Sequence, residues 1–258
     1  MSDFSKEYRN KLFGEHVSQL AKTDPEYAQF FDNFAFDEVI NAQCEEGQAP
    51  IDDKTRLLAI LATLLGCQGL DAFHFMLPAA LNVGVTPVEV KELVYQATAY
   101  LGFGRIFPFL KVTNAILDNR GVKLPLEPQG TTTPENRVAQ GNQVQIEYFG
   151  EQMRECWKNA PSGLKNVNYW LAGNCFGDYY TRKGLNDRQR EIITFCILSA
   201  QGGCEPQLIG HALGNMRVGN SAGFLRQIVE QCLPYIGYPR SLNAMTAISR
   251  AVEQSQNK

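Results

Sequence analysis

The sequence predicts an all-α protein made of two tandem helical repeats, and three observations support this prediction. Apolar residues recur at helical spacing along most of the 258-residue chain, whereas no stretch alternates clearly enough to be a strand. Capping residues, first-turn prolines and terminal glycines mark where helices begin and end. Adding 135 to a position in the first half leads to a similar residue in the second half, as expected of two equivalent units packed together.

The first half opens with a predicted helical region over residues 1–45, which ends at the break formed by residues 47–50. A helix predicted at 54–65 follows two aspartates and is apolar on three sides, so it should be buried in a core or an interface. The next predicted helix, 71–82, ends before Gly84, a residue suited to the left-handed conformation that follows many helices.

The strongest helix start signal begins at Thr86. Thr86 is predicted to cap the helix, Pro87 to occupy its first position and Glu89 to reach back in a capping box. This helix should end before a turn at residues 101–104, and a last helix of the first half should end near Gly121.

Residues 122–142 change character, because they are rich in proline, glycine and threonine, and they are predicted to be a linker. The linker separates an N-terminal repeat, residues 1–121 with its helical extension, from a C-terminal repeat, residues 143–258. Pairs of positions 135 residues apart include Asp52 and Asp187, Gly84 and Gly219, Thr86 and Ser221, Tyr100 and Tyr235, Gly102 and Gly237, Phe103 and Tyr238, and Arg105 and Arg240.

Charge and hydropathy exclude several classes of partner. The formal net charge is −3 and no basic cluster occurs, so the sequence carries no electrostatic footprint for nucleic acid or for a membrane surface. The first residues lack the apolar stretch of a signal peptide, and the longest apolar run, Leu57–Leu65, is too short to span a bilayer. We therefore expect a cytoplasmic protein.

The chain has seven cysteines, and we expect them to be reduced because the number is odd and no export signal is present. No Cys-x-x-Cys pair occurs. With only three histidines, His16, His74 and His211, a zinc site is not expected, and nothing in the sequence implies another cofactor.

Several segments together resemble the carboxymuconolactone decarboxylase and alkylhydroperoxidase D-like (CMD/AhpD-like) family. The resemblance covers residues 50–120 and 184–253. It rests on 185–191 (LNDRQRE), 203–211 (GCEPQLIGH), 215–219 (NMRVG) and 234–244 (PYIGYPRSLNA) in the second half, and on 53–56 (DKTR), 80–87 (ALNVGVTP) and 100–103 (YLGF) in the first.

The family implies an all-α fold, here two tandem CMD/AhpD-like repeats, and assemblies with three-fold symmetry. A two-repeat chain is then expected to form a homotrimer that supplies six units. The resemblance also implies a small-molecule substrate, and a thiol reductant if the protein acts as a peroxidase.

The family contains two chemistries. Its decarboxylases use a histidine and nearby acids on a lactone acid, and its peroxidase-like members use a Cys-x-x-Cys-x-x-x-His motif with an upstream glutamate. Carried over by motif, the histidine is His211, the first cysteine is Cys204 and the upstream glutamate is Glu191. Gln207 stands at the second cysteine position, so the disulfide-forming pair is missing, and it also stands where decarboxylase-like members usually have a glutamate.

Each candidate catalytic residue has two interpretations. Cys204 precedes a helix whose positive end favours a thiolate nucleophile, or it is a buried apolar filler. His211, two turns or roughly 10 Å further along the helix, is a general acid or base, or a core histidine bonded to the backbone. Glu191 precedes apolar residues and exchanges protons, or it lies on the surface. Glu205 is a catalytic acid, or only a first-turn helix charge.

A predicted substrate-binding side consists of Arg240, Gln207 and Tyr238. Arg240 and its repeat partner Arg105 can each bind a carboxylate in a fork, or form an ion pair in a subunit interface. Cys175 is the missing second thiol brought in by folding, or a packing residue.

The first repeat leaves two alternatives open. Cys67 and His74 are separated by seven positions, as are Cys204 and His211, but they are displaced from the repeat register by two residues. In that register His211 corresponds to Met76. Either Cys67 and His74 form a second, displaced site, or the first repeat has lost its site and kept the scaffold.

Three functions follow as hypotheses. The first is a carboxymuconolactone decarboxylase-like lyase that performs acid/base chemistry on a small carboxylated lactone or keto acid. The second is a thiol-dependent peroxidase of the alkylhydroperoxidase D or peroxiredoxin type, an oxidoreductase that uses Cys204. The third is a non-catalytic oligomeric binder of small molecules.

Overall fold

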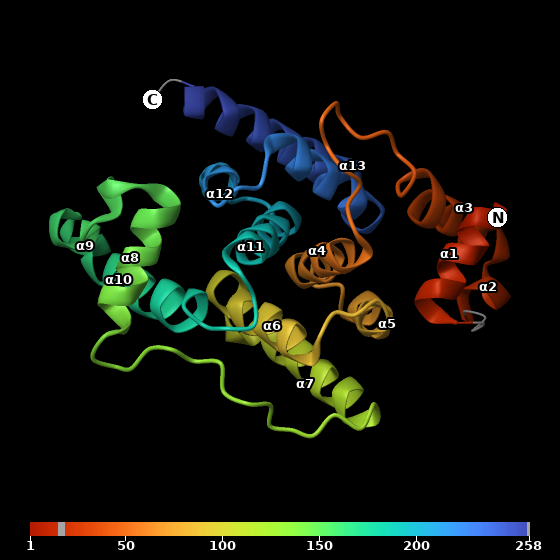
Figure 1. The fold of residues 1–258 in the computed structure, drawn as a ribbon, viewed down its shortest axis with the longest axis horizontal. Coiled ribbons are helices and arrows are strands. Elements are labelled where there is room, and N and C mark those ends of the chain that lie inside the picture. Colours follow the sequence, from red (N-terminus) through yellow and green to blue (C-terminus); the bar gives the residue numbers. More distant parts are fainter. Residues whose placement is uncertain (15–18, 257–258) are drawn as a thin grey trace.

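The computed structural model describes residues 1–14 and 19–256, and within them every regular element is a helix (Figure 1). This confirms the predicted all-α class. His16 lies outside the described residues. In the same part of the chain, no helix combines the length and the apolar character needed to cross a membrane.

The first repeat is a four-helix unit preceded by an N-terminal extension. The extension comprises α1 (Asp3–Phe13), α2 (Gln19–Thr23), α3 (Pro25–Asn33) and the π-helical η1 (Phe34–Glu38), and the unit comprises α4 (Asp53–Gly66), α5 (Leu70–Asn82), α6 (Pro87–Leu101) and α7 (Phe103–Asn119). The Thr86 capping box is present as predicted, with Glu89 bonded back to the Thr86 backbone.

The second repeat has the same layout. It begins with α8 (Arg137–Phe149), η2 (Glu151–Met153), α9 (Cys156–Asn159), η3 (Ser162–Leu164), α10 (Lys165–Trp170) and the π-helical η4 (Leu171–Tyr180), and it continues with α11 (Asp187–Gln201), α12 (Glu205–Arg217) and α13 (Ala222–Gln256). Helix α13 is kinked at Gly237 (φ 74°), where the first repeat separates α6 from α7 at Gly102 (φ 78°). Both glycines have a positive φ that other residues rarely adopt, so the repeat includes the bend.

Two predicted details need correction. Residues 137–142 were predicted to be linker but form the first turns of α8, because the Asn136 side chain accepts a bond from Thr133 N and closes a turn before the helix. Asp187 was paired with the capping residue Asp52, yet Asn186 caps α11. Positions along α4 and α11 are therefore 134 residues apart, not 135.

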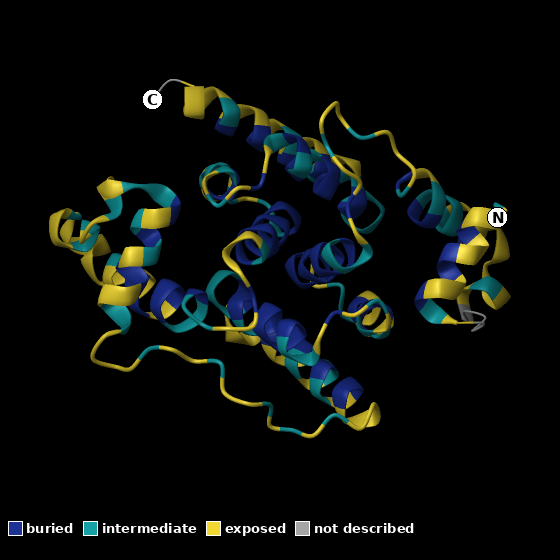
Figure 2. Cartoon of the chain, in the orientation of Figure 1, coloured by how far each residue is buried: buried dark blue, intermediate teal, exposed yellow. Residues whose placement is uncertain are grey.

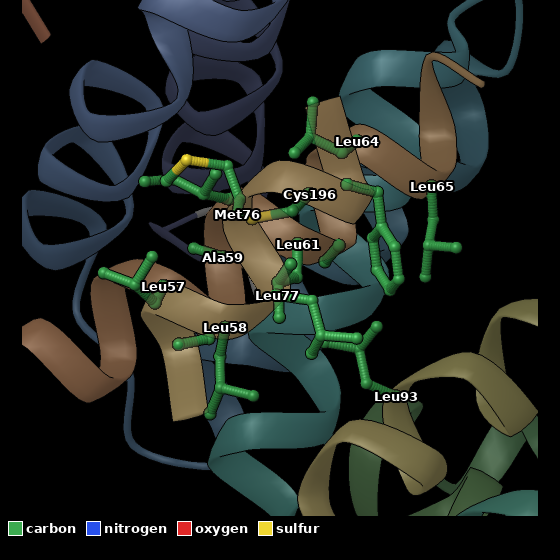
Figure 3. Packing of buried hydrophobic residues seen from close by; sticks show 14 of the residues in the cluster. Leu57, Leu58, Ala59, Leu61, Leu64, Leu65, Met76, Leu77, Leu93 and Cys196 are labelled. Carbon is green, nitrogen blue, oxygen red and sulfur yellow. The ribbon is translucent and has the colours of Figure 1, made fainter. Parts of the chain in front are cut away.

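Helices α4 and α11 cross at the centre of the molecule (Figure 1) and are its most deeply buried elements (Figure 2). They approach closely at Gly66, where an added Cβ would lie 2.5 Å from the Ile197 carbonyl oxygen. Figure 3 shows leucines of α4 packed with Met76, Leu77, Leu93 and Cys196, which come from α5, α6 and α11. The core is thus shared by both repeats.

Two buried arginines join the repeats in a reciprocal way. Arg56 of the first repeat donates through Nε to Gln231 Oε1 of the second at 2.8 Å. Arg190 of the second repeat donates through Nη1 to Gln96 Oε1 of the first, also at 2.8 Å. These four side chains are equivalent in pairs, so the molecule has an approximate internal two-fold symmetry.

Candidate active site

A histidine and a carboxylate lie together beneath the surface of the second repeat. His211 on α12 places Nδ1 at 3.1 and 3.0 Å from the two carboxylate oxygens of Glu191 on α11. Glu191 is fully buried, and the His211 side chain keeps 10% of its area exposed. A buried carboxylate needs such a partner, and in return it fixes the orientation of the imidazole ring.

The backbone around this pair is also fixed. Asn215, one turn after His211, donates through Nδ2 to the Glu191 carbonyl oxygen at 2.9 Å and to the His211 carbonyl oxygen at 2.8 Å. Gly214 faces the carboxylate so closely that an added Cβ would lie 2.5 Å from Glu191 Oε2. A side chain at this position would displace the Glu191 carboxylate from where it meets His211.

The other imidazole nitrogen faces a tyrosine of the first repeat. Tyr100 Oη, at the end of α6, lies 3.5 Å from His211 Nε2. Tyr100 Oη is also 2.5 Å from Tyr180 Oη, which in turn is 2.6 Å from Thr194 Oγ1. Burial of the two phenols raises the pKa of both tyrosines well above the ordinary value, so both hydroxyls keep their protons and can donate.

Helices α8 and η4 form an aromatic wall beside the imidazole. They pack backbone against backbone because Gly141 and Gly177 have no side chain at the contact. Phe149 from α8 meets the His211 ring edge-to-face at 5.2 Å. Buried Cys175 from η4 has its Sγ 3.9 Å from Tyr100 Oη, and burial raises the pKa of this thiol to about 12. Cys175 therefore has the environment of a packing residue.

Cys204 lies at the start of α12, as predicted, but not as an activated thiol. Its Sγ is 3.5 Å from the Leu198 carbonyl oxygen, and the side chain packs partly buried against the core of the second repeat. Burial raises the pKa of Cys204, the Glu205 carboxylate raises it further, and the Arg240 guanidinium only partly opposes them. Of the two interpretations of Cys204, the structure therefore favours a packing residue over an activated thiolate.

The other predicted residues of the second repeat are spread over the surface. Glu205 is exposed and accepts a bond from Gly203 N at 3.2 Å, which is the local role of a first-turn helix charge. Gln207 is exposed, and Tyr238 is 63% exposed. Arg240 packs against Gly202 and, with Arg105 and Cys67, lines an open hollow of about 460 Å³. The residues lining this hollow do not include His211 or Glu191.

The first repeat has a counterpart of the histidine site, but apolar side chains replace the histidine, the glutamate and the threonine. By the repeat offsets, Leu57 stands in place of Glu191, Ile60 in place of Thr194 and Met76 in place of His211. Together with Tyr235, the counterpart of Tyr100, they border a void of only about 10 Å³. Cys67 and His74 are both exposed and lie outside this void. The arrangement favours a lost site over a displaced one.

Two residues of the site were not among the predicted ones. Tyr100 was recognised as a repeat position but not as a site residue, and Tyr180 was not singled out. Tyr100 comes from the other repeat and Tyr180 from a π-helix, so local spacing gives no sign that their hydroxyls meet. A tyrosine at the same position of both repeats was the available signal.

Within residues 1–14 and 19–256, no group of three or more histidine, cysteine, aspartate or glutamate side chains is arranged to hold a metal ion. The seven cysteines are all free thiols.

Comparison with known proteins found relatives in sequence and in fold. A curated 4-carboxymuconolactone decarboxylase of Acinetobacter baylyi is 28% identical over 118 residues, which are 43% of this chain and 83% of that protein. A solved structure from Burkholderia xenovorans LB400, of a proposed gamma-carboxymuconolactone decarboxylase subunit, matches 97% of this chain and 98% of its own with a TM-score of 0.53. At 18% identity, that similarity shows the fold alone.

The model of one protein family matches both halves of the chain, at residues 25–115 and 166–250. These two segments correspond to the two repeats and together cover most of the sequence. The chain belongs to the carboxymuconolactone decarboxylase family.

Proposed function

We propose that the protein is a carboxymuconolactone decarboxylase-like lyase that acts on a small carboxylated lactone or keto acid at His211. The observation that carries the proposal is the buried contact of His211 Nδ1 with the Glu191 carboxylate at 3.0 Å. The curated relative from Acinetobacter supports the substrate class by its name.

The geometry suits a proton transfer at one defined atom. Because Glu191 accepts from Nδ1, the Nδ1 position carries a hydrogen, and Nε2 is the nitrogen that gives or takes a proton. Nε2 lies 3.5 Å from Tyr100 Oη, and the Phe149 ring packs against the imidazole in a T-shaped contact, so Nε2 works in a partly dehydrated setting. Glu191 stabilises the imidazolium form without taking the proton itself.

In the proposed step, the bond between the substrate carbon and its carboxylate breaks and CO₂ leaves. The electron pair stays on the carbon as an enolate, and the protonated Nε2 of His211 delivers a proton to that carbon. His211 is then reprotonated from solvent. A donated hydrogen bond from Tyr100 would stabilise the developing enolate oxygen.

The thiol peroxidase alternative has less support. Its nucleophile would be Cys204, whose pKa is raised rather than lowered, and Gln207 supplies no second thiol.

The variants His211→Gln and Glu191→Gln test the proposal. Their decarboxylation of 4-carboxymuconolactone is measured through the release of CO₂. Loss of a positioned general acid lowers kcat by roughly 10²–10⁴-fold. We expect such a loss in both variants. His74→Gln is the matched control, because His74 is an exposed histidine of the first repeat, and it should keep wild-type kcat. Activity of His211→Gln equal to that of wild type would reject the proposal.

We also propose that copies of the chain associate through a surface that repeats about the internal two-fold axis. Phe103 and Phe107 are 65% and 46% exposed, and their counterparts Tyr238 and Leu242 are each 63% exposed. Four large apolar side chains in equivalent positions on α7 and α13 are more than scattered exposure. A homotrimer remains the expected assembly.

A further inference from the structure

A cavity lies between the first repeat and the linker, and the reaction proposed above does not use it. We call it the linker pocket. It has a volume of about 440 Å³ and is bordered by α6, α7, residues 124–129 and Arg182. This volume falls within the roughly 300–1,000 Å³ that small-molecule sites occupy. In Figure 1 the linker is the long segment without helices that runs from the end of α7 to α8.

Helix α6 presents a polar stripe to the linker pocket. Val88, Lys91, Glu92 and Tyr95 follow one another at helical spacing and all line it. The opposite side is residues 124–129, where two leucines and two prolines stand with Glu127 and Gln129. The pocket therefore has a charged wall from α6 and a mostly apolar wall, stiffened by proline, from the linker.

Lys91 is the unusual residue of the charged wall. It is only 8% exposed, and its ammonium group donates to Asn114 Oδ1 at 2.7 Å and lies 5.1 Å from the centre of the Tyr95 ring. Among the ion pairs formed by the described residues, none includes Lys91. An ammonium has three hydrogens to donate, and burying it without an anion is costly.

The nearby buried carboxylate is already neutralised. Glu92 is 1% exposed and accepts two bonds at 2.9 Å from Arg182, and Arg190 Nη2 lies 3.5 Å from it on the other side. With two guanidinium groups bound to Glu92, this carboxylate is already paired. Glu127 also lines the pocket but is exposed and forms no ion pair with Lys91. The Lys91 ammonium is therefore available to an anion that enters the pocket.

We infer that the linker pocket binds a small monocarboxylic acid with an apolar body. Its carboxylate would accept from Lys91 Nζ and from the Asn114 amide nitrogen, which is left as a donor because Oδ1 faces Lys91. Its body would lie between the Tyr95 ring and the prolines of the linker. A dianion fits less well, because the lining also carries Glu92 and the exposed Glu127.

Benzoate is a suitable probe, and titration calorimetry of the full-length protein measures its binding. We expect one benzoate per chain, binding that weakens as salt is added, and no binding of benzamide, which has the same shape without the charge. Lys91→Met removes the ammonium at similar volume and should weaken benzoate binding at least tenfold. Lys91→Arg keeps a cation and should retain binding, which guards against a general effect of substitution.

Two controls separate this site from the proposed active site. Lys111 is an exposed lysine on α7, a helix that borders the pocket, but Lys111 itself does not line it. Lys111→Met should therefore leave benzoate binding unchanged. His211→Gln should also bind benzoate normally, whether or not it has lost decarboxylation. Wild-type protein that does not bind benzoate, or a Lys91→Met variant that binds it as tightly as wild type, would overturn the inference. The inference would also be overturned if His211→Gln lost benzoate binding while Lys91→Met kept it.

Discussion

At the scale of single residues, the environment of each side chain decides its chemistry more than its place in a motif does. His211 and Cys204 both belong to the recognised motif, on or next to one helix. His211 meets a buried carboxylate and a tyrosine hydroxyl, whereas Cys204 meets a backbone carbonyl and apolar side chains. Only His211 therefore has partners that prepare it for proton transfer.

Gly214→Ala tests how closely the site is packed. The new methyl group would lie 2.5 Å from Glu191 Oε2, and the fully buried carboxylate would have to move away from His211. We expect kcat to fall at least tenfold and the unfolding free energy to fall by about 1–3 kcal/mol. Steady-state kinetics and urea denaturation measure the two effects.

The control for that substitution lies on the same helix. Gly210 has no atom within 4 Å of an added Cβ, so Gly210→Ala should keep full activity and gain up to about 1 kcal/mol from helix propensity. If Gly214→Ala behaves like Gly210→Ala, the contact with Glu191 is looser than described.

Cys204→Ser should leave decarboxylation within about twofold of wild type, because no step of the proposed reaction uses the sulfur. In the wild-type protein, the raised pKa of Cys204 makes the reactivity of its thiol depend on pH. The thiolate is the reactive form, so alkylation of Cys204 by iodoacetamide should stay slow at neutral pH and accelerate only above the pKa of free cysteine. Peptide mass spectrometry follows this cysteine separately from the other six. Rapid alkylation at pH 7 would contradict the raised pKa.

The residue scale also shows how far sequence reasoning reaches into the site. The family motif identified His211 and Glu191, because both stand at fixed positions on neighbouring helices. It did not identify Tyr100 and Tyr180, whose contact depends on the packing of two repeats. Arg240 was predicted to bind a substrate carboxylate or to form an ion pair in a subunit interface, and both remain predictions. The structure places its side chain over Gly202, in a hollow that His211 does not line.

At the scale of elements, close contacts between helices determine the architecture. The crossing of α4 and α11 depends on Gly66, where a methyl group would lie 2.5 Å from the Ile197 carbonyl oxygen and 2.8 Å from Ala200 Cβ. A carbonyl of a buried helix moves only with the helix itself. Gly66 is therefore a packing residue and not a flexible point of the chain.

We expect Gly66→Ala to lower the unfolding free energy by about 1–3 kcal/mol, despite the better helix propensity of alanine. For a chain of this size the melting temperature falls by roughly 2–4 °C per kcal/mol, which differential scanning calorimetry resolves. Gly104→Ala on α7 is the matched control, because its Cβ would meet nothing within 4 Å, and it should not lower the melting temperature. An equal effect of the two substitutions would argue against the close crossing.

Helices were predictable where local signals define them. The capping box at Thr86 and the glycines at 84, 102, 219 and 237 act through their own backbone geometry, so they were found from sequence. The start of α8 was not, because residues 137–142 include Gly141 and lack a clear apolar pattern, and they pack against η4, which local sequence does not show. The repeat offset of 134 between α4 and α11 was also missed. Aspartates stand at both 52 and 53, so either one could be paired with Asp187.

At the scale of the whole molecule, the two repeats share a scaffold but differ in what fills it. The reciprocal pairs of Arg56 with Gln231 and Arg190 with Gln96 are kept on both sides. The histidine and the glutamate of the candidate site are present in the second repeat only, because Met76 and Leu57 stand at their positions in the first. The predicted two-repeat organisation is thus confirmed. That the first repeat lacks the residues of the candidate site was only partly visible from the sequence, where Met76 stands at the position of His211.

The proposed association surface makes a prediction at this scale. Phe107→Glu and Leu242→Glu together place charges in equivalent positions on α7 and α13, where the side chains are already exposed, so the fold should tolerate them. We expect wild-type protein to run as a trimer in light scattering coupled to size exclusion, and the double variant to run as a monomer. A variant with unchanged mass would show that this surface is not the interface.

Because Tyr100 belongs to the first repeat and His211 to the second, both halves of the chain contribute to the proposed site. Splitting the gene at the linker would part the phenol from the imidazole, so neither product would inherit both groups. The proposed reaction therefore requires the two halves to be made and folded as one polypeptide.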